Sequence, residues 1–442
     1  MKSEAVPFSV GRVTRFFLPL LLQGLSQSLS YPLVAGIVTG SALGIDALTA
    51  FSQGLTVMFM IGSIGGGLIT TGLVFARTWN GYVSFRRLNS LMMAILLVIQ
   101  CLVALPPLGE LIFEDFFALP PALAEVSRFT LVASVVMNCG FFIRNLPMVV
   151  LFNRLESGKA NNATLVRLVV SVLCACLFPR WGWTGPAWGL AALTFGVWVE
   201  TAITWFYARP YLRQLPNHPQ FDLGGIELPP LAALTLEQFR FTLPLSLGGF
   251  LLALSPVAIA AFVARTADAG EMLAIHHVTL GVANPIAYAA LKLQPVAVKF
   301  LPEYPGDRRL LGYAVVAGLV LGLIPLAFAT PWLGHWYFAV FQHVPERILP
   351  TVRLVIGVYA LIAVVHAVRA RIEGIAAARR RPDAVMIGEC AYTLALIAVG
   401  AALLRTSVAG WALALVAVFI APVATTAAVY AALKWRRRKA EA

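Results

Sequence analysis

Long apolar runs separated by short polar segments recur along the whole chain. The runs have 17 to 29 residues, and a helix needs about 20 to cross a bilayer. Because a helix satisfies its own backbone hydrogen bonds inside the bilayer, the runs are expected to be membrane-spanning α-helices. Twelve spans are predicted, over residues 16–39, 47–75, 88–109, 128–152, 163–179, 186–208, 240–264, 272–300, 310–333, 347–370, 384–404 and 410–433.

Composition agrees with this pattern and excludes a water-soluble globular protein. Of the 442 residues, 60% are hydrophobic and 12% are charged. Lys and Arg gather in alternate loops and in the terminal KWRRRK run, which predicts that both termini are cytoplasmic. The net charge of +13 is therefore mostly a matter of topology. Since the basic residues are dispersed over several loops, nucleic acid is not an expected partner.

The second half of the chain repeats the first at a spacing of 225 residues. The stretch RFFLPLLLQGLSQSLS starts at Arg15, and RFTLPLSLGGFLLALS starts at Arg240. Of the 14 Lys and Arg residues before residue 218, seven fall on another Lys or Arg after this shift, whereas about one would do so by chance. Arg144 and Arg369 are one such pair.

The repeat predicts two similar lobes. Residues 1–208 would form an N-terminal six-helix lobe, 209–239 a cytoplasmic linker, and 240–442 a C-terminal six-helix lobe with a basic tail. Because six is even, both lobes start on the same side, so they are parallel repeats. The expected fold is an all-α polytopic membrane protein whose lobes face each other across a central cleft and work by alternating access.

One polar stripe is predicted along the eighth span. At about 100° per residue, seven residues fall on one face of this helix. Asn284 precedes Pro285, which frees a backbone carbonyl near mid-membrane. Lysine within a span is costly unless it faces water or a partner, so Lys292 is the favoured ligand contact. The stripe comprises His277, Gly281, Asn284, Tyr288, Lys292, Pro295 and Lys299.

The equivalent face of the second span is small and hydroxylated, with Ser63 and Thr70. Gln23 and Gln27 of the first span are predicted to join it in lining the opposite wall of the cleft. Arg144 and Arg369 would form a basic cytoplasmic vestibule, although each could also extend to the membrane surface, and Arg369 could pair with Glu373. An excess of positive charge favours anions.

Other kinds of site have little support in the sequence. It has no Walker loop, no HExxH motif and no paired acids on one face, so neither catalysis nor a bound metal or cofactor is expected. His277 and Lys299 are weaker candidates for ligand contacts, because a lone histidine near a helix end is often structural and a lysine near the membrane surface can extend into water. A pore is also compatible with the spans.

Several stretches are similar to a known family. The chain resembles the multidrug/oligosaccharidyl-lipid/polysaccharide exporter superfamily, and within it the progressive ankylosis family. The similar stretches are GLVFARTWNGYVSFRRLN, LAIHHVTLGVANPIAYAALKLQPVAVKFLPEYP and AVRARIEGIAAARRRP. This resemblance implies export of small polyanions such as citrate, ATP or pyrophosphate, with the same sign of charge that the stripe indicates.

The expected function is therefore an exporter of small organic or phosphate anions in a bacterial inner membrane, acting as a monomer among membrane lipids. Two alternatives stay open. The first is a flippase for a pyrophosphate-linked lipid, whose headgroup would occupy the same cationic site. The second is a cation-coupled multidrug exporter, which would need buried carboxylates such as Glu200 and Glu389.

Overall fold

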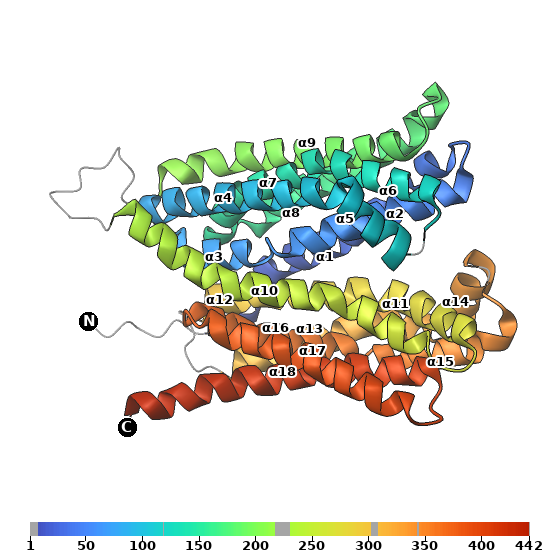
Figure 1. Ribbon diagram of the computed structural model, residues 1–442. Helices are drawn as coiled ribbons and strands as arrows, with labels where there is room; N and C mark the ends of the chain where they lie inside the picture. Colours follow the sequence, from blue (N-terminus) through green and yellow to red (C-terminus); the bar gives the residue numbers. More distant parts are fainter. Residues whose placement is uncertain (1–7, 118, 217–229, 302–307, 343, 442) are drawn as a thin grey trace. The chain divides into compact units, whose positions relative to one another are not determined.

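The computed structural model describes residues 8–117, 119–216, 230–301, 308–342 and 344–441 as α-helices, short helical turns and connecting loops. The side chains of 26–32, 45, 341 and 436–441 lie outside this description. Within each compact unit the helices run alongside one another (Figure 1). The all-α polytopic fold predicted from the sequence is confirmed.

The first repeat consists of nine α-helices with two short helical turns in the described part. The α-helices are α1 (Val10–Thr39), α2 (Gly44–Ser63), α3 (Gly67–Phe75), α4 (Trp79–Ala104), α5 (Pro106–Glu110), α6 (Pro121–Ala133), α7 (Val135–Asn153), α8 (Ser157–Leu177) and α9 (Pro186–Arg213). The turns are the π-helical η1 (Leu111–Phe116) and the 3-10 turn η2 (Pro179–Trp181).

The second repeat has the same order of α-helices, but its 3-10 turn is at a different position from that of the first. Its α-helices are α10 (Leu231–Val263), α11 (Ala269–Leu291), α12 (Leu293–Phe300), α13 (Arg309–Phe328), α14 (Pro331–Gly334), α15 (Leu349–Tyr359), α16 (Ile362–Ala378), α17 (Pro382–Leu404) and α18 (Gly410–Glu441). Its turns are the π-helical η3 (His335–Phe341) and the 3-10 turn η4 (Glu346–Ile348).

Ten helical stretches in the described residues are long and apolar enough to cross a membrane. Two more predicted spans fall on α1 and on the broken helix formed by α11 and α12. Helix ends differ by several residues from the predicted ones. For example, α4 was expected to start at residue 88 but begins at Trp79, because the hydroxyl of Thr78 accepts a hydrogen bond from the Gly81 N–H at 3.3 Å and caps the helix.

The 225-residue spacing holds for individual bonds as well as for helices. Arg128 donates from Nε to the carbonyl of Ala104 at 3.2 Å, and Arg353 donates in the same way to Ala329 at 3.1 Å. Arg353 is 225 positions after Arg128, and Ala329 is 225 positions after Ala104. The π-helical turns η1 and η3 also fall at equivalent positions. The repeat is thus a repeat of structure, not only of charge.

By contacts between residues, the chain divides into two compact units whose boundaries differ from the predicted ones. The N unit is Ser26–Phe250, and the C unit is the chain up to Leu25 together with Leu251–Ala442. The chain therefore passes from one unit to the other inside α1 and again inside α10, not in the predicted linker at 209–239. Much of that linker, residues 217–229, lies outside the described residues.

The first part of α10, up to Phe250, belongs to the N unit and is held there by polar and aromatic contacts. The hydroxyls of Thr242 and Thr71 are 2.7 Å apart, and Gln238 donates from Nε2 to the Gly81 carbonyl at 3.1 Å. The rings of Phe75 and Phe241 pack edge to face, with centroids 5.2 Å apart. At the equivalent positions of the C unit, Phe300 and Phe16 form a similar pair at 5.8 Å.

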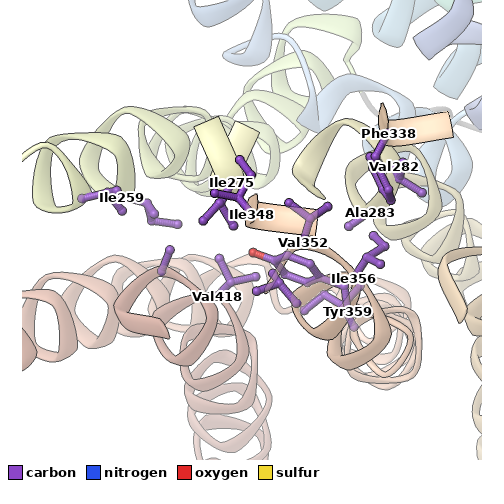
Figure 2. Close-up of a cluster of buried hydrophobic side chains, with 14 of the residues drawn as sticks. Ile259, Ile275, Val282, Ala283, Phe338, Ile348, Val352, Ile356, Tyr359 and Val418 are labelled. Atoms are coloured by element: carbon purple, nitrogen blue, oxygen red, sulfur yellow. The ribbon is translucent and has the colours of Figure 1, made fainter. Parts of the chain in front are cut away.

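A continuous apolar core fills the C unit between α11, α15 and α18. Figure 2 shows Val352, Ile356 and Tyr359 of α15 in the same cluster as Ile275 and Val282 of α11. All five side chains are buried. Burial of such side chains stabilises the fold by roughly 1.5–3 kcal/mol each. This packing fixes the rotation of α11 and decides which of its faces is left at the surface of the unit.

Candidate functional site

The predicted polar stripe lies on the exposed face of α11. His277 and Tyr288 are exposed, and Asn284 and Lys292 are half-buried. The opposite face of α11 is buried. Its buried residues are Ile275, His276, Thr279, Val282, Ala283, Ile286, Ala287, Ala289 and Ala290. The helical-wheel prediction therefore selected the residues that do not serve the core of the C unit.

Lys292 occupies the break between α11 and α12. Its N–H bonds to the carbonyl of Ala289, three residues back, at 3.1 Å. Pro295 explains the break, because it has no N–H to offer to the carbonyl of Leu291. Its ring also disfavours a continuous α-helix at this point. The aliphatic stem of Lys292 lies against Gly24 of α1, where an added Cβ would be 3.3 Å from the lysine Cε.

The residues predicted for the opposite wall belong to different compact units. Ser63 and Thr70 belong to the N unit, where Ser63 is half-buried and donates to the Met60 carbonyl at 2.6 Å, and Thr70 is buried. Gln23 is buried and belongs to the C unit, together with Lys292. The side chain of Gln27 lies outside the described residues. Lys299 is half-buried near the end of α12.

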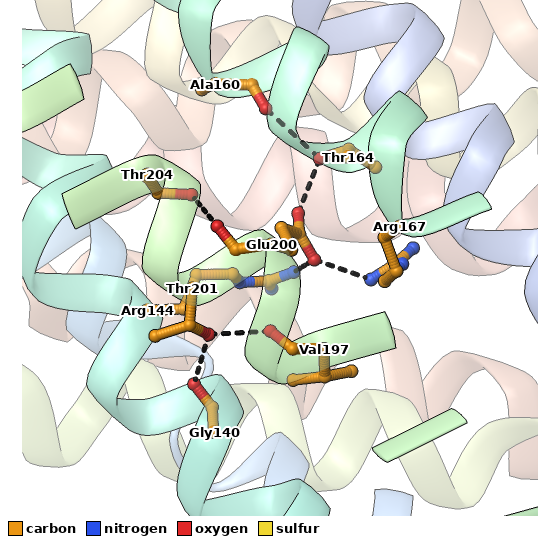
Figure 3. A network of polar contacts seen from close by, with 9 residues as sticks. All are labelled: Gly140, Arg144, Ala160, Thr164, Arg167, Val197, Glu200, Thr201 and Thr204. Atoms are coloured by element: carbon orange, nitrogen blue, oxygen red, sulfur yellow. Dashed lines mark hydrogen bonds and ion pairs between the residues drawn. The ribbon is translucent and has the colours of Figure 1, made fainter. Parts of the chain in front are cut away.

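Arg144 belongs to a buried ionic cluster in the N unit, formed with Arg167, Thr164 and Glu200 (Figure 3). Arg144 and Arg167 each donate from Nη1 to Oε2 of Glu200, at 2.8 and 3.0 Å. Thr164 donates to Oε1 of the same carboxylate at 2.5 Å. The Glu200 side chain is completely buried. Two arginines and one glutamate give this cluster a formal charge of +1.

Arg369 forms the corresponding cluster in the C unit. Its Nε donates to Oε1 of Glu373 at 2.6 Å, and its Nη2 donates to Oε1 of Glu389. All three side chains are at most 6% exposed. The Tyr392 ring stacks over the guanidinium, with the Arg369 Cζ 4.8 Å from the ring centroid. The local pair with Glu373 that the sequence allowed is present.

The prediction of a basic vestibule at Arg144 and Arg369 is therefore wrong. Both arginines are buried and paired with carboxylates that arrive from neighbouring helices. A guanidinium in an apolar interior is tolerated only when its charge and donors are satisfied, which explains why the acids are there. The sequence analysis had identified Glu200 and Glu389 as intramembrane acids but had not connected them with these arginines.

The two clusters are related by an exchange of acid and threonine. With the 225-residue shift, Thr164 corresponds to Glu389, and Glu200 corresponds to Thr425. In the first repeat the acid comes from α9 and the threonine from α8, whereas in the second repeat the acid is on α17 and the threonine on α18. The same shift relates Arg167 to Tyr392. Applying the repeat offset to the acids, as well as to the basic residues, would have revealed this pattern from the sequence.

Metal binding receives no support from the described residues, in which no group of three or more His, Cys, Asp and Glu side chains could hold a metal ion. The candidate site is thus an exposed polar stripe with one lysine at a helix break, placed on a unit whose buried charges are paired with one another.

Searches against family models and against curated proteins give no match to this sequence. Solved structures do match over almost the whole chain. A eukaryotic MATE transporter, AtDTX14, aligns at 14% identity and a TM-score of 0.71, covering 96% of this chain and 95% of that one. This is the fold of the MATE transporters.

Two further MATE-fold structures align equally well. A MOP superfamily transporter from Pyrococcus furiosus shares 14% identity at a TM-score of 0.70, covering 97% of this chain and 95% of that one. A variant of the Vibrio cholerae MATE transporter VcmN shares 16% identity at a TM-score of 0.71, covering 96% of this chain and 97% of that one. The MATE fold is multi-pass and membrane-embedded, in agreement with the apolar helices here. Similarity to the progressive ankylosis family stays a prediction.

Proposed function

We propose that the chain is a membrane transporter, not an enzyme, and that it exports small organic or phosphate anions such as citrate, ATP or pyrophosphate. Lys292 would contact the substrate, with Asn284 and Tyr288 beside it on the same stripe. We further propose a bacterial inner-membrane protein that acts as a monomer, has both termini in the cytoplasm and works by alternating access. The MATE fold supports the transporter class.

The position of Lys292 is the main observation in favour of an anionic substrate. The buried arginines Arg144 and Arg369 are engaged with carboxylates, so their charge is not on the exposed stripe. Lys292 lies on the stripe and at a helix break, where the regular backbone bonding of α11 ends. A partly buried ammonium group is well suited to bind a carboxylate or a phosphate.

One of the similar structures is the MOP superfamily transporter from Pyrococcus furiosus, in which reverse polarity of the binding pocket suggests a different function. For the present chain, a cation on the stripe supports an anion as substrate instead of a cationic drug.

Transport by purified protein in liposomes tests the proposal. Labelled citrate, ATP and pyrophosphate are offered to the wild type, Lys292→Ala, Lys292→Arg and, as a matched control, Lys299→Ala. We expect transport of at least one anion, a KM raised about 10- to 100-fold in Lys292→Ala by loss of a charge-assisted contact of about 1.5–3 kcal/mol, and partial rescue in Lys292→Arg.

The other outcomes favour different substrates. If intact protein carries none of the soluble anions but scrambles a pyrophosphate-linked lipid, the flippase alternative holds. If it carries organic cations, and Lys292→Ala improves that activity, the multidrug exporter holds. Equal loss in Lys292→Ala and Lys299→Ala would show that general positive charge, not the helix break, matters.

A further inference from the structure

Two equivalent turns, one in each unit, have the same backbone and different charges. The turn between α7 and α8 and the turn between α16 and α17 each contain a residue in the left-handed region, Leu155 with φ 61° and Arg380 with φ 55°. In both turns the next residue donates its N–H to the carbonyl five residues back, at 2.8 Å. The two turns are 225 positions apart, so the same helix ending is built once in each repeat.

In the N unit the side chains at this turn are bound by groups of the same unit. The Tyr211 hydroxyl, near the end of α9, accepts from Lys159 at 2.5 Å and donates to Oε1 of Glu156 at 2.6 Å. Arg154 donates from Nη2 to the carbonyl of Gln214 at 2.7 Å. A carboxylate, a phenol and a helix-end carbonyl thus take up the positive charge here.

The C unit has cations where the N unit has these partners. With the 225-residue shift, the positions of Glu156, Tyr211 and Gln214 are held by Arg381, Arg436 and Lys439. Residues 379–383 and 434–441 contain eight Lys and Arg and two acids, whereas the equivalent residues 154–158 and 209–216 contain three and one. One of the two acids, Asp383, is already paired with Arg381 through two hydrogen bonds of 2.9 Å. Like charges at this density repel one another, so the cluster is suited to bind an anion.

Arg371 extends the basic cluster into the membrane-spanning part of α16. It precedes Arg379 by eight residues, which is about 12 Å along a helix, and its side chain is half-buried. Its Nε is buried and has no hydrogen-bond partner in the described part of the chain, and Arg379 is near enough to repel its charge. Because a buried donor without an acceptor is costly, a ligand oxygen at this point would stabilise the arginine.

The depth of the cluster indicates a lipid instead of a dissolved anion. Arg371 belongs to Glu346–Ala378, a stretch long and apolar enough to cross a membrane, and the KWRRRK run starts at the end of another, Gly410–Trp435. Trp435 is 65% exposed, and tryptophan at the end of a spanning helix is typical of the membrane–water interface. Four to eight cations directly after a spanning helix attract anionic phospholipids, and basic pockets between spanning helices bind their headgroups.

We propose that this end of the C unit, cytoplasmic in the proposed topology, binds the headgroup of an anionic phospholipid. Arg371 and the turn at residues 379–381 hold the phosphate, and the basic end of α18 attracts it over a longer range. In the N unit, Glu156 and Gln214 take the place of the lipid. The bound lipid stays in the membrane, so the site does not depend on what the protein transports.

Native mass spectrometry of the full chain in detergent measures the lipid affinity. Phosphatidylglycerol is compared with phosphatidylcholine that has the same acyl chains. We expect the first phosphatidylglycerol to bind the wild type at least about tenfold more tightly than phosphatidylcholine. Replacement of all three turn arginines, Arg379→Gln, Arg380→Gln and Arg381→Gln, should weaken phosphatidylglycerol binding by about 10- to 100-fold and leave phosphatidylcholine binding unchanged.

A matched control removes three exposed cations from the N unit, with Arg86→Gln, Arg87→Gln and Arg213→Gln. This variant should keep the wild-type affinity for phosphatidylglycerol. Arg371→Gln leaves the turn intact and should weaken binding by about fivefold, so it decides the matter if the triple turn variant does not fold. Thermal unfolding gives an independent readout, because phosphatidylglycerol should raise the midpoint of the wild type more than that of Arg371→Gln.

Three results would overturn the proposal. The first is equal affinity of the wild type for the two lipids, and the second is an unchanged affinity for phosphatidylglycerol in Arg371→Gln or an equal loss in the two triple variants. The third is displacement of phosphatidylglycerol by inorganic phosphate at a similar concentration, which would indicate a site for a soluble anion. None of these measurements requires a transported substrate, so their failure would leave the proposed anion export untouched.

Discussion

Glu200 and Glu389 pair with equivalent arginines but reach them from different helices. Glu200 on α9 meets Arg144, and Glu389 on α17 meets Arg369, although the helix equivalent to α9 is α18. At each site the helix that does not supply the acid carries a threonine at the equivalent position. An arginine buried between three helices can thus be neutralised from either neighbour, so the same scaffold supports two charge arrangements.

Removal of the Glu200 charge should strongly destabilise the N unit. In Glu200→Gln, two buried arginines would lose their common carboxylate, and breaking a buried pair in this way costs about 3–5 kcal/mol. Thermal unfolding in detergent measures the loss as a lower midpoint. Glu271→Gln is the control, because the partner of Glu271, Arg347, is 76% exposed and such pairs contribute about 0–1 kcal/mol. Similar midpoints for both variants would contradict the prediction.

An exchange within the first repeat should restore much of that stability. Glu200→Thr combined with Thr164→Glu moves the acid to the position that Glu389 has in the second repeat. We expect the double variant to unfold at a higher temperature than Glu200→Thr alone, because the carboxylate again faces Arg144 and Arg167. A coupling energy in the double-mutant cycle of about 1–3 kcal/mol is expected for residues in one network. Additive losses would show that the two repeats do not hold their arginines equivalently.

The packing of Gly24 against Lys292 should influence substrate binding. In Gly24→Ala the new methyl group would lie 3.3 Å from the lysine Cε, so the flexible stem has to shift by a few tenths of an ångström. If Lys292 contacts the substrate, KM should rise by up to about tenfold, equivalent to about 1.4 kcal/mol, with little change in thermal stability. Gly36→Ala in the same helix is the control, since a Cβ there meets no described atom within 4 Å. An unchanged KM in Gly24→Ala would argue against this role.

A disulfide between positions 71 and 242 should arrest transport if α10 moves against α3. The hydroxyl oxygens of Thr71 and Thr242 are 2.7 Å apart, which places the side chains near the distance that an S–S bond of about 2.05 Å requires. We expect Thr71→Cys with Thr242→Cys to cross-link under mild oxidation, to lose transport, and to recover it on reduction. Each single variant under oxidation is the control. Full activity of the cross-linked protein would mean that this contact is kept throughout the transport cycle.

The sequence by itself determined the helical membrane fold and the internal repeat. Both depend on local or periodic properties: apolar runs of sufficient length, and a spacing of 225 residues at which seven basic residues coincide, Arg144 with Arg369 among them. It also identified the face of α11 that carries Lys292, because a helix of known period that buries its apolar side must expose the other one. These features do not depend on which helices become neighbours.

Only the tertiary structure decided which charges neutralise one another and where the compact units begin. Arg144 and Glu200 are 56 residues apart, and Arg369 and Glu389 are 20 apart, so their pairing depends on how α7, α8 and α9, or α16 and α17, pack. The passage of α1 and α10 between units has the same origin, since contacts such as Thr71 with Thr242 join residues 171 positions apart. The burial that makes an unpaired charge costly is created by packing, and a one-dimensional pattern contains no record of it.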